Sequence, residues 1–203
     1  MAMGNSSESE SCDFRCLTVV ALCPDPDAFE LAVFHLTDSL GHLSTEECTY
    51  FNVIRGELKL RVKKPNHNKD GELIAYKRVE TPLEGVYLAE GSSTFVQNVD
   101  LIRNTLRVSI SELGTLNVKR RVFTSDQITI NLDKLEGIGT YAEIDLGIAT
   151  PQPTEADYEQ IKRIQDALGI KQGQLVPYSY LELFRKLKLS DSGLDDESNQ
   201  SDG

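Results

Sequence analysis

The chain has 203 residues, a formal net charge of −11 and 39% hydrophobic residues, with no tryptophan. This length suits one domain with a proper core. No apolar run approaches the roughly 20 residues of a membrane span, and no signal-peptide core follows Met1. The acidic balance argues against broad nucleic-acid binding, because it provides no overall release of counterions from a phosphate backbone. We therefore expect no membrane and no nucleic-acid partner.

The cysteines show no pattern of a metal site. They form no CxxC pair and have no histidine at a matching spacing. Reduced thiols are expected, and with them a cytoplasmic location. The four cysteines are Cys12, Cys16, Cys23 and Cys48.

Both ends of the chain are polar and acidic. Residues 1–14 and 190–203 contain little that could be buried, so disordered tails are expected there. The segment between them, residues 15–189, is the expected folded domain.

The domain begins with a predicted strand and helix. Residues 15–23 are largely apolar and are followed by two prolines, which indicates a strand that ends there. Apolar residues at helical spacing predict a helix over 24–41, with Asp25 or Asp27 as its N-cap and Gly41 at its end. The apolar stripe consists of Phe29, Val33, Leu36 and Leu40.

Two alternating runs, within residues 49–64 and 71–79, form the most informative pattern. In the first, apolar and cationic residues alternate, so that Lys59 and Arg61 share one strand face. In the second, Arg78 shares a face with Ile74 and Tyr76. The polar turn KPNHNKDG makes the pair a hairpin. A cationic strand face points either to water or to an anion, and the pattern alone leaves both interpretations open.

The second half is predicted to contain a helix, three strands and two further helices. Residues 81–95 show no clear pattern. Helical spacing predicts an amphipathic helix over 96–114, ended by Gly114. Further amphipathic helices are expected at 154–170 and 177–189. The strand segments are 116–123, 127–133 and 139–148, and the last two alternate clearly.

This order of elements predicts an α+β fold. Strands in sequential runs favour an antiparallel arrangement over a doubly wound parallel sheet. Strands with one polar and one apolar face indicate an antiparallel β-barrel with a polar interior and amphipathic helices packed outside.

Charged residues on the polar strand faces are the candidate site. In one barrel interior, the cations could hold phosphate oxygens, and the carboxylates could hold Mg²⁺ or Mn²⁺ that bridges to the same phosphates. Internal salt bridging without a ligand is the other interpretation, and both remain open. The cations are Lys59, Arg61, Arg78 and Arg120, and the carboxylates are Asp133, Glu143 and Asp145.

Several segments together resemble a known family. TYFNV, GELKLR and GELIAYKR, then RRVF and ITINLDKLEGIGTYAEIDL, and finally SYLELF, are similar to the class IV adenylyl cyclase branch of the CYTH family, the triphosphate tunnel enzymes. The match covers residues 15–189. The resemblance implies an eight-stranded antiparallel barrel, a triphosphate or polyphosphate ligand and a divalent metal. It also implies hydrolysis of a triphosphate or cyclisation of ATP to cyclic AMP, and a homodimer, since relatives are often dimeric.

The resemblance assigns roles residue by residue. The four cations named above match the phosphate-binding residues of the family. Glu143 and Asp145 match the acidic pair that takes part in metal binding, and Asp133 matches the acidic residue at the end of the preceding strand.

The chain departs from the family at its signature, an ExExK motif on the first strand. The corresponding positions hold Cys16, Thr18 and Val20, which alternate and should share one face. Cys48 stands where many relatives have aspartate, and Val118 where a lysine is usual. Losing two carboxylates should weaken metal binding and misplace the nucleophile, whereas the retained cations could still bind an anion.

Three functions remain open. The first is a phosphate-binding tunnel with reduced or no catalysis, that is, a pseudoenzyme. The second is an active metal-dependent triphosphatase or adenylyl cyclase that uses Asp133, Glu143 and Asp145. The third is a scaffold whose acidic tail, residues 190–203, recruits a partner.

Overall fold

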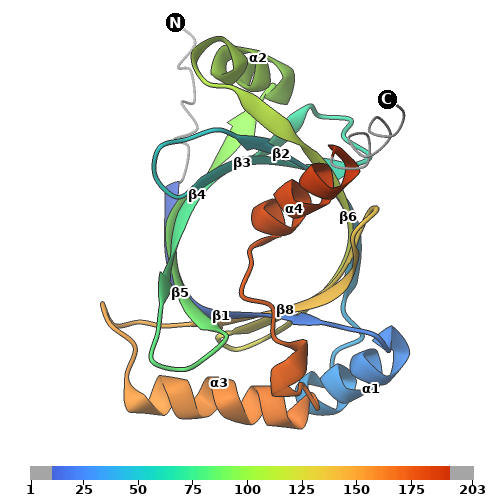
Figure 1. The fold of residues 1–203 in the computed structure, drawn as a ribbon, viewed down its shortest axis with the longest axis vertical. Helices are drawn as coiled ribbons and strands as arrows, with labels where there is room; N and C mark the ends of the chain where they lie inside the picture. The colour runs from blue at the N-terminus through green and yellow to red at the C-terminus, as the bar shows by residue number, and fades with distance from the viewer. Residues whose placement is uncertain (1–10, 193–203) are drawn as a thin grey trace, which may run out of the picture.

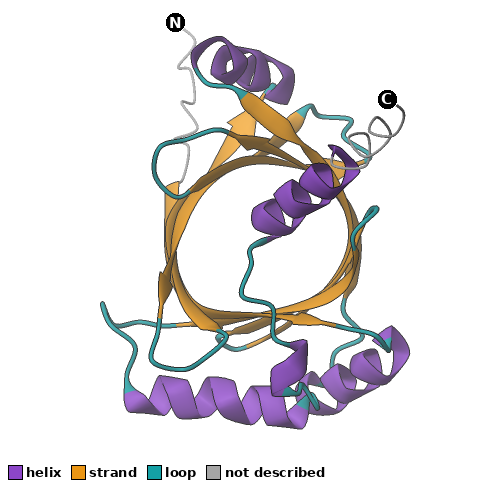
Figure 2. Ribbon diagram, viewed as in Figure 1, coloured by secondary structure: helices purple, strands orange, loops and turns teal. Residues whose placement is uncertain are grey.

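A closed barrel of eight antiparallel strands forms the body of the molecule (Figure 1, Figure 2). The computed structural model describes residues 11–192. The α+β class and the eight-stranded antiparallel barrel predicted above are confirmed. In barrel order the strands are β1 (Ser11–Leu22), β5 (Val86–Gln97), β4 (Asp70–Glu80), β3 (Glu57–Lys64), β2 (His42–Phe51), β6 (Glu112–Ser125), β7 (Ile128–Leu135) and β8 (Gly139–Gly147), which pairs with β1.

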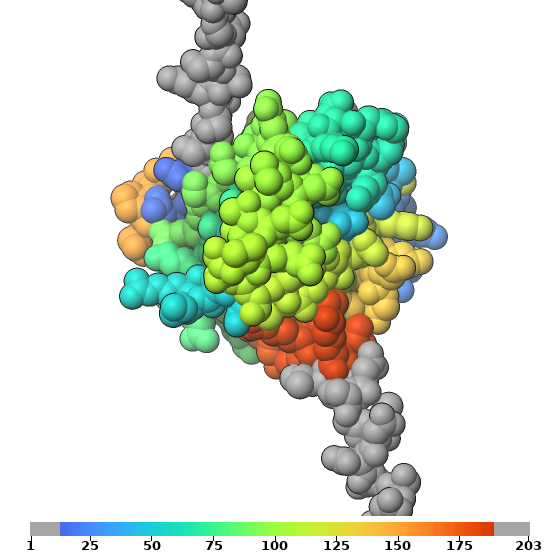
Figure 3. Space-filling view, turned by 90° about the horizontal axis from the view of Figure 1, so that it is seen from above, coloured from blue at the N-terminus to red at the C-terminus, as the bar shows by residue number. Residues whose placement is uncertain are grey.

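Three helices pack outside the barrel, and a fourth lies across one mouth (Figure 1). α1 (Pro26–Thr37) and α3 (Glu155–Ala167) cover one outer wall, and α2 (Val99–Ser109) covers the opposite wall. Figure 3 shows α2 exposed on that second face, with α4 (Tyr180–Ser192) beside it. In the described part of the chain, no helix has the length and apolar composition needed to cross a bilayer.

The outer strand faces hold the helices by burying apolar side chains. Leu17 and Ile144 are fully buried in one cluster with residues of α1 and α3. Leu60 and Val62 are buried with Val99 of α2. Each such side chain contributes about 1.5–3 kcal/mol when it leaves water, so the barrel wall and its helices stabilise each other.

One end of the barrel interior is apolar, in contrast to the predicted polar interior. Leu116 and Val118 share the strand face of Arg120, and both are buried in a cluster with Tyr180 and Phe184 of α4. This cluster, together with α4, fills one end of the barrel. The polar residues are therefore confined to the remaining part of the interior.

Two predicted helices end earlier than their spacing suggests. α1 ends at Thr37, because Asp38 adopts the left-handed conformation of a C-cap, with φ of 52°, and Gly41 lies beyond the helix. α2 ends at Ser109, and Gly114 belongs to β6. The chain after α2 pairs with β2, so strand pairing prevails over the continuing helical spacing.

Most of residues 81–95, where the sequence shows no pattern, form β5. Gly91 explains part of this failure, because a Cβ there would lie 2.4 Å from the carbonyl oxygen of Ala75 on β4. A side chain is excluded from that position, and the usual alternation is interrupted.

The predicted tails overlap the described residues only slightly. β1 begins at Ser11, and α4 extends to Ser192. Residues 1–10 and 193–203, the rest of both predicted tails, lie outside the described residues.

Candidate anion-binding site

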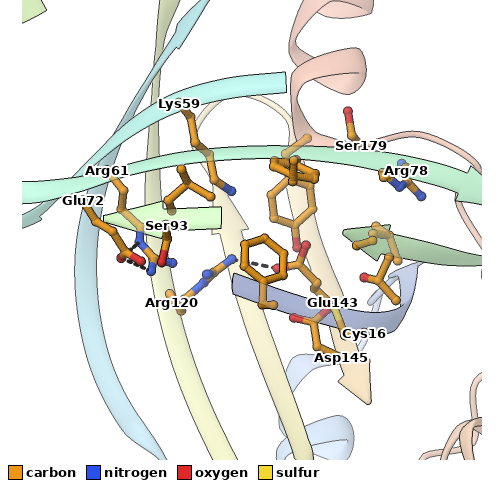
Figure 4. Close-up of a pocket in the computed structure, with 17 residues that line it drawn as sticks. Cys16, Lys59, Arg61, Glu72, Arg78, Ser93, Arg120, Glu143, Asp145 and Ser179 are labelled. Carbon is orange, nitrogen blue, oxygen red and sulfur yellow. Dashed lines mark hydrogen bonds and ion pairs between the residues drawn. The ribbon is translucent and has the colours of Figure 1, made fainter. Parts of the chain in front are cut away.

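A cavity of about 220 Å³ inside the barrel is lined by β1, β3, β4, β5, β6, β8 and the start of α4 (Figure 4). Six of the seven predicted site residues line it, and Asp133 is the exception. The charged lining residues are Lys59, Arg61, Glu72, Arg78, Arg120, Glu143 and Asp145. The alternation of the strands therefore gathers the predicted charges in one place.

Arg120 is held by a buried network of carboxylates. Its Nε donates to Asp133 Oδ1 at 2.7 Å, and its Nη2 contacts Asp133 Oδ2 at 2.5 Å and Glu143 Oε2 at 3.0 Å. Tyr180 of α4 donates its hydroxyl proton to Asp133 Oδ2 at 2.9 Å. The network exists because Arg120 and Asp133 are direct partners across β6 and β7.

This network fixes the charge states of its members. Burial opposes the charged guanidinium, but Asp133 and Glu143 together raise the pKa of Arg120 well above its usual value. Burial raises the pKa of Asp133, although Arg120 acts in the opposite direction. Asp133 is 0% exposed, so its carboxylate serves Arg120 and does not face the cavity.

Arg61 is also paired within the wall. Its Nε donates to Glu72 Oε2 at 3.2 Å, and its Nη2 contacts the same oxygen. Glu72 is the direct cross-strand partner of Arg61. Despite partial burial, Arg61 lowers the pKa of Glu72. For Arg61 and Arg120, therefore, the structure has the internal salt bridges that the charge pattern left open.

Lys59 and Arg78 are the cations with the least neutralisation. The Lys59 ammonium lies 5.2 Å from the centroid of the Tyr76 ring, and no carboxylate among the described residues is at ion-pair distance. The Arg78 guanidinium lies 4.0 Å over the Tyr87 ring, and its Nη1 is 3.6 Å from Glu182 Oε2. Nε and Nη2 of Arg78 are buried, and neither has a hydrogen-bond partner within residues 11–192.

Cys16, Thr18 and Val20 all line the cavity, as their spacing predicts. Thr18 is the cross-strand partner of Asp145, and Val20 is the partner of Glu143. The positions of the family signature therefore lie directly beside the two carboxylates of β8, and they carry a thiol, a hydroxyl and an aliphatic group.

Asp145 is strongly affected by this setting. Burial, with a further contribution from the negative charge of Glu143, raises its pKa to about 7. The Cys16 thiol lies 3.7 Å from Asp145 Oδ1 and donates to it, and burial raises the pKa of this thiol as well. The neutral form of Asp145 is thus favoured far more than that of an ordinary carboxyl group.

The residues present do not fit a divalent metal. Mg²⁺ and Mn²⁺ need several oxygen ligands. Glu143 already accepts from Arg120 and Asn131, Asp145 accepts from Cys16, and no carboxylate of β1 lines the cavity. Within residues 11–192, no three His, Cys, Asp or Glu side chains are grouped as a metal site would require. Metal binding by Glu143, Asp145 and Asp133 remains a prediction that this geometry does not favour.

The other two departures from the family are Val118 and Cys48. Val118 is buried in the apolar end cluster, whereas Lys119 is exposed on the outside. Cys48 is buried at 5% exposure beside Arg61 on the neighbouring strand. The interior therefore lacks a lysine and a carboxylate at these two positions.

Sequence reasoning missed Glu72, Tyr180, Ser179 and Glu182. Glu72 could have been found, because it precedes Ile74 by two residues and so extends the same strand face. The α4 residues carry no comparable signal, since nothing in the spacing of a C-terminal helix shows that it lies across a barrel mouth.

Solved structures share this barrel. PH1012 from Pyrococcus horikoshii is 17% identical, with a TM-score of 0.67 over 83% of this chain and 98% of that chain. A candidate adenylate cyclase from Vibrio parahaemolyticus is 16% identical, with a TM-score of 0.63 over 85% and 98%. HpAC1 from Hippeastrum, a candidate adenylyl cyclase with a dominant triphosphatase activity, is 15% identical, with a TM-score of 0.58 over 84% and 95%.

These likenesses, all below 25% identity, establish the fold and nothing finer. No protein-family model and no curated protein sequence matches the chain. The shared barrel is the one that the sequence motifs predict, and the chain therefore has the triphosphate tunnel fold of CYTH domains.

Proposed function

We propose that the barrel binds a triphosphate-containing ligand, a nucleotide or an inorganic polyphosphate, with reduced or no turnover. The observation that carries the proposal is the inner face of β1. Cys16, Thr18 and Val20 lie beside the β8 carboxylates, where two acids and a lysine are expected in the family. The site has kept cations for an anion and lost the groups that would hold a metal.

Lys59 and Arg78 support the binding half of the proposal. Both line the cavity. Among the described residues, Lys59 has no carboxylate at ion-pair distance, and Arg78 has only the loose contact with Glu182 at 3.6 Å. A charge-assisted hydrogen bond to an anion is worth about 1.5–3 kcal/mol. Arg78 Nε and Nη2 are buried without a partner among the described residues, so a small shift of the guanidinium toward the cavity would let them bond to an anion there. Arg61 and Arg120 attract an anion through their positive charge, but their guanidinium groups stay paired with Glu72 and Asp133 of the barrel wall.

The carboxylates of the cavity support the second part of the proposal, reduced or absent turnover. Phosphoryl transfer depends on metal ions that neutralise the transferred group and on a positioned nucleophile. Glu143 is bonded to Arg120 and Asn131, so it is poorly placed to do either. Asp145 accepts a hydrogen bond from the Cys16 thiol, so this carboxylate is engaged as well.

An active metal-dependent triphosphatase or adenylyl cyclase is the second candidate, because Glu143 and Asp145 both face the cavity. Glu143→Gln should then abolish turnover, and activity that persists in this variant would exclude the assignment. A scaffold role through residues 190–203 involves a segment that is mostly outside the described residues.

The test is calorimetric titration with inorganic tripolyphosphate and with ATP, with and without Mg²⁺ or Mn²⁺. The same samples are assayed for released phosphate and cyclic AMP. We expect binding that does not require metal, and no product. A ligand at about 100 times its dissociation constant adds roughly 2.7 kcal/mol to the free energy of unfolding, so a thermal shift provides a cross-check.

Other outcomes would change the conclusion. Metal-dependent binding with product would establish the second candidate. Binding that survives the double change Arg61→Ala with Arg78→Ala would show that the ligand sits outside this cavity, and no binding at all would leave only the fold.

A further inference from the structure

Glu182, in the first turn of α4, is the one carboxylate among the described residues at ion-pair distance from Arg78. Its Oε2 is 3.6 Å from Arg78 Nη1. The same oxygen accepts a hydrogen bond from the backbone N–H of Ser179 at 2.7 Å, and Ser179 Oγ accepts from the Glu182 N–H at 3.2 Å. These reciprocal bonds form a capping box, so α4 itself positions Glu182 against Arg78.

Arg78 lines both the inner cavity and a second, outer pocket. It lines the inner cavity, where Ser179 is its neighbour in Figure 4, and it also lines an outer pocket of about 360 Å³ together with Glu80, Tyr87 and Glu182. Its side chain is only 11% exposed, whereas that of Glu182 is 50% exposed. The guanidinium is therefore held more tightly than the carboxylate, and a turn of Glu182 into water would cost its hydrogen bond from the Ser179 N–H.

From these contacts we infer that Glu182 is a built-in competitor of the anionic ligand for Arg78, and so sets the affinity and charge selectivity of the tunnel. This inference rests on the proposed function. The Glu182 carboxylate contacts Nη1 of the guanidinium, and the buried Nε and Nη2 have no hydrogen-bond partner among the described residues. A ligand that draws the guanidinium inward must replace the attraction of Glu182.

The competition has a predictable consequence for selectivity. A monoanion exchanges one carboxylate contact for a similar one and gains little. A phosphoryl group offers more charge and three oxygens that can engage Nε and Nη2 together. The tunnel should then discriminate against singly charged anions, even though its interior is polar enough to admit them.

The experiment compares Glu182→Gln with Glu80→Gln in titrations with inorganic tripolyphosphate. Glutamine at position 182 can still accept the Ser179 N–H, so the helix cap is kept while the charge is removed. Glu80 is an exposed residue of the same outer pocket and has no contact with Arg78 among the described ion pairs. The control therefore removes the same charge at the same place without relieving the competition.

We expect Glu182→Gln to tighten binding by about two- to fivefold, the range for a partly exposed ion pair. Glu80→Gln should give a smaller change, and the thermal midpoints without ligand should be equal to that of the wild type. Equal affinities for the two variants, in a protein that binds tripolyphosphate, would overturn this inference and leave the proposed function intact. Absence of binding in all three proteins would overturn both.

Discussion

Arg120 and Arg78 face the same cavity and have opposite surroundings. Arg120 makes three close contacts with Asp133 and Glu143 and is buried. Arg78 rests on the Tyr87 ring, with one loose contact to Glu182 and two buried nitrogens that find no partner in the described part of the chain. The comparison shows that residues matching one family role can be divided between holding the barrel together and remaining available to a ligand.

The difference arises from the strands opposite each arginine. Arg120 faces Asp133 across β6 and β7, so a carboxylate is provided by the register. Arg78 faces Ala89 of β5, which has no polar group to offer. An arginine with an internal partner stabilises the fold, whereas one without a partner retains unused hydrogen-bonding capacity.

The largest effect should come from breaking the Arg120 network. Asp133→Ala leaves a buried guanidinium with its main partner removed, and we expect a loss of about 3–5 kcal/mol in the free energy of unfolding, measured by urea denaturation. Tyr180→Phe is the matched control, because it removes one hydrogen bond to Asp133 and leaves the ion pair. A loss below about 1 kcal/mol for Asp133→Ala would mean that Arg120 is not structural.

Replacing Arg78 should weaken ligand binding much more than it lowers the stability of the fold. Arg78→Gln is expected to weaken tripolyphosphate binding by about 1.5–3 kcal/mol, measured by calorimetry. Thermal stability should fall only slightly, because the change removes the Tyr87 ring contact and one loose ion pair. Lys77→Gln removes the same charge from an exposed neighbour on the opposite strand face. Similar losses in both variants would reduce the role of Arg78 to general electrostatics.

The smallest effect concerns Asp145. Its pKa is about 7 in the folded protein against an ordinary value of 3.8, so the folded state binds a proton that the unfolded state releases. Stability should therefore fall as pH rises from about 5 to 7 and level off above, with a limiting slope of about 1.4 kcal/mol per pH unit. Water in the cavity reaches this half-buried carboxylate, so the slope should be shallower.

Urea denaturation across this pH range measures the Asp145 effect. Asp145→Asn cannot ionise, and its stability should change less with pH than that of the wild type. A wild-type protein whose stability follows the same pH profile as Asp145→Asn would contradict the assignment of a raised pKa to this residue.

The fold was largely predictable from the strands that alternate. In β7 and β8, Ile130 and Ile144 are buried outward while Asp133 and Glu143 point inward, as their spacing requires. β5 was not predictable, since Gly91 removes a side chain from the pattern to admit the backbone of β4. The spacing of residues along a strand predicts which face each side chain occupies. It does not show where the backbone of another strand approaches closely.

The sequence predicted which cations line the cavity, but not which of them are neutralised by a carboxylate. Lys59, Arg61, Arg78 and Arg120 all reach the cavity, because strand alternation alone decides that. Which of them are neutralised depends on register, and Glu72 becomes the partner of Arg61 only once β3 and β4 are aligned. Those pairings are tertiary facts, so the sequence could not rank the cations by availability.

The contact between Arg78 and the Tyr87 ring should also make the intrinsic tyrosine fluorescence of the protein sensitive to ligand binding. The chain has seven tyrosines and no tryptophan, so its intrinsic ultraviolet fluorescence comes from phenol rings. Tyr76 and Tyr180 line the cavity, and Tyr87 lies under the guanidinium. An anion that moves Arg78 changes the field at a phenol ring, and occupancy of the tunnel could be followed optically, without a label or a coupled assay.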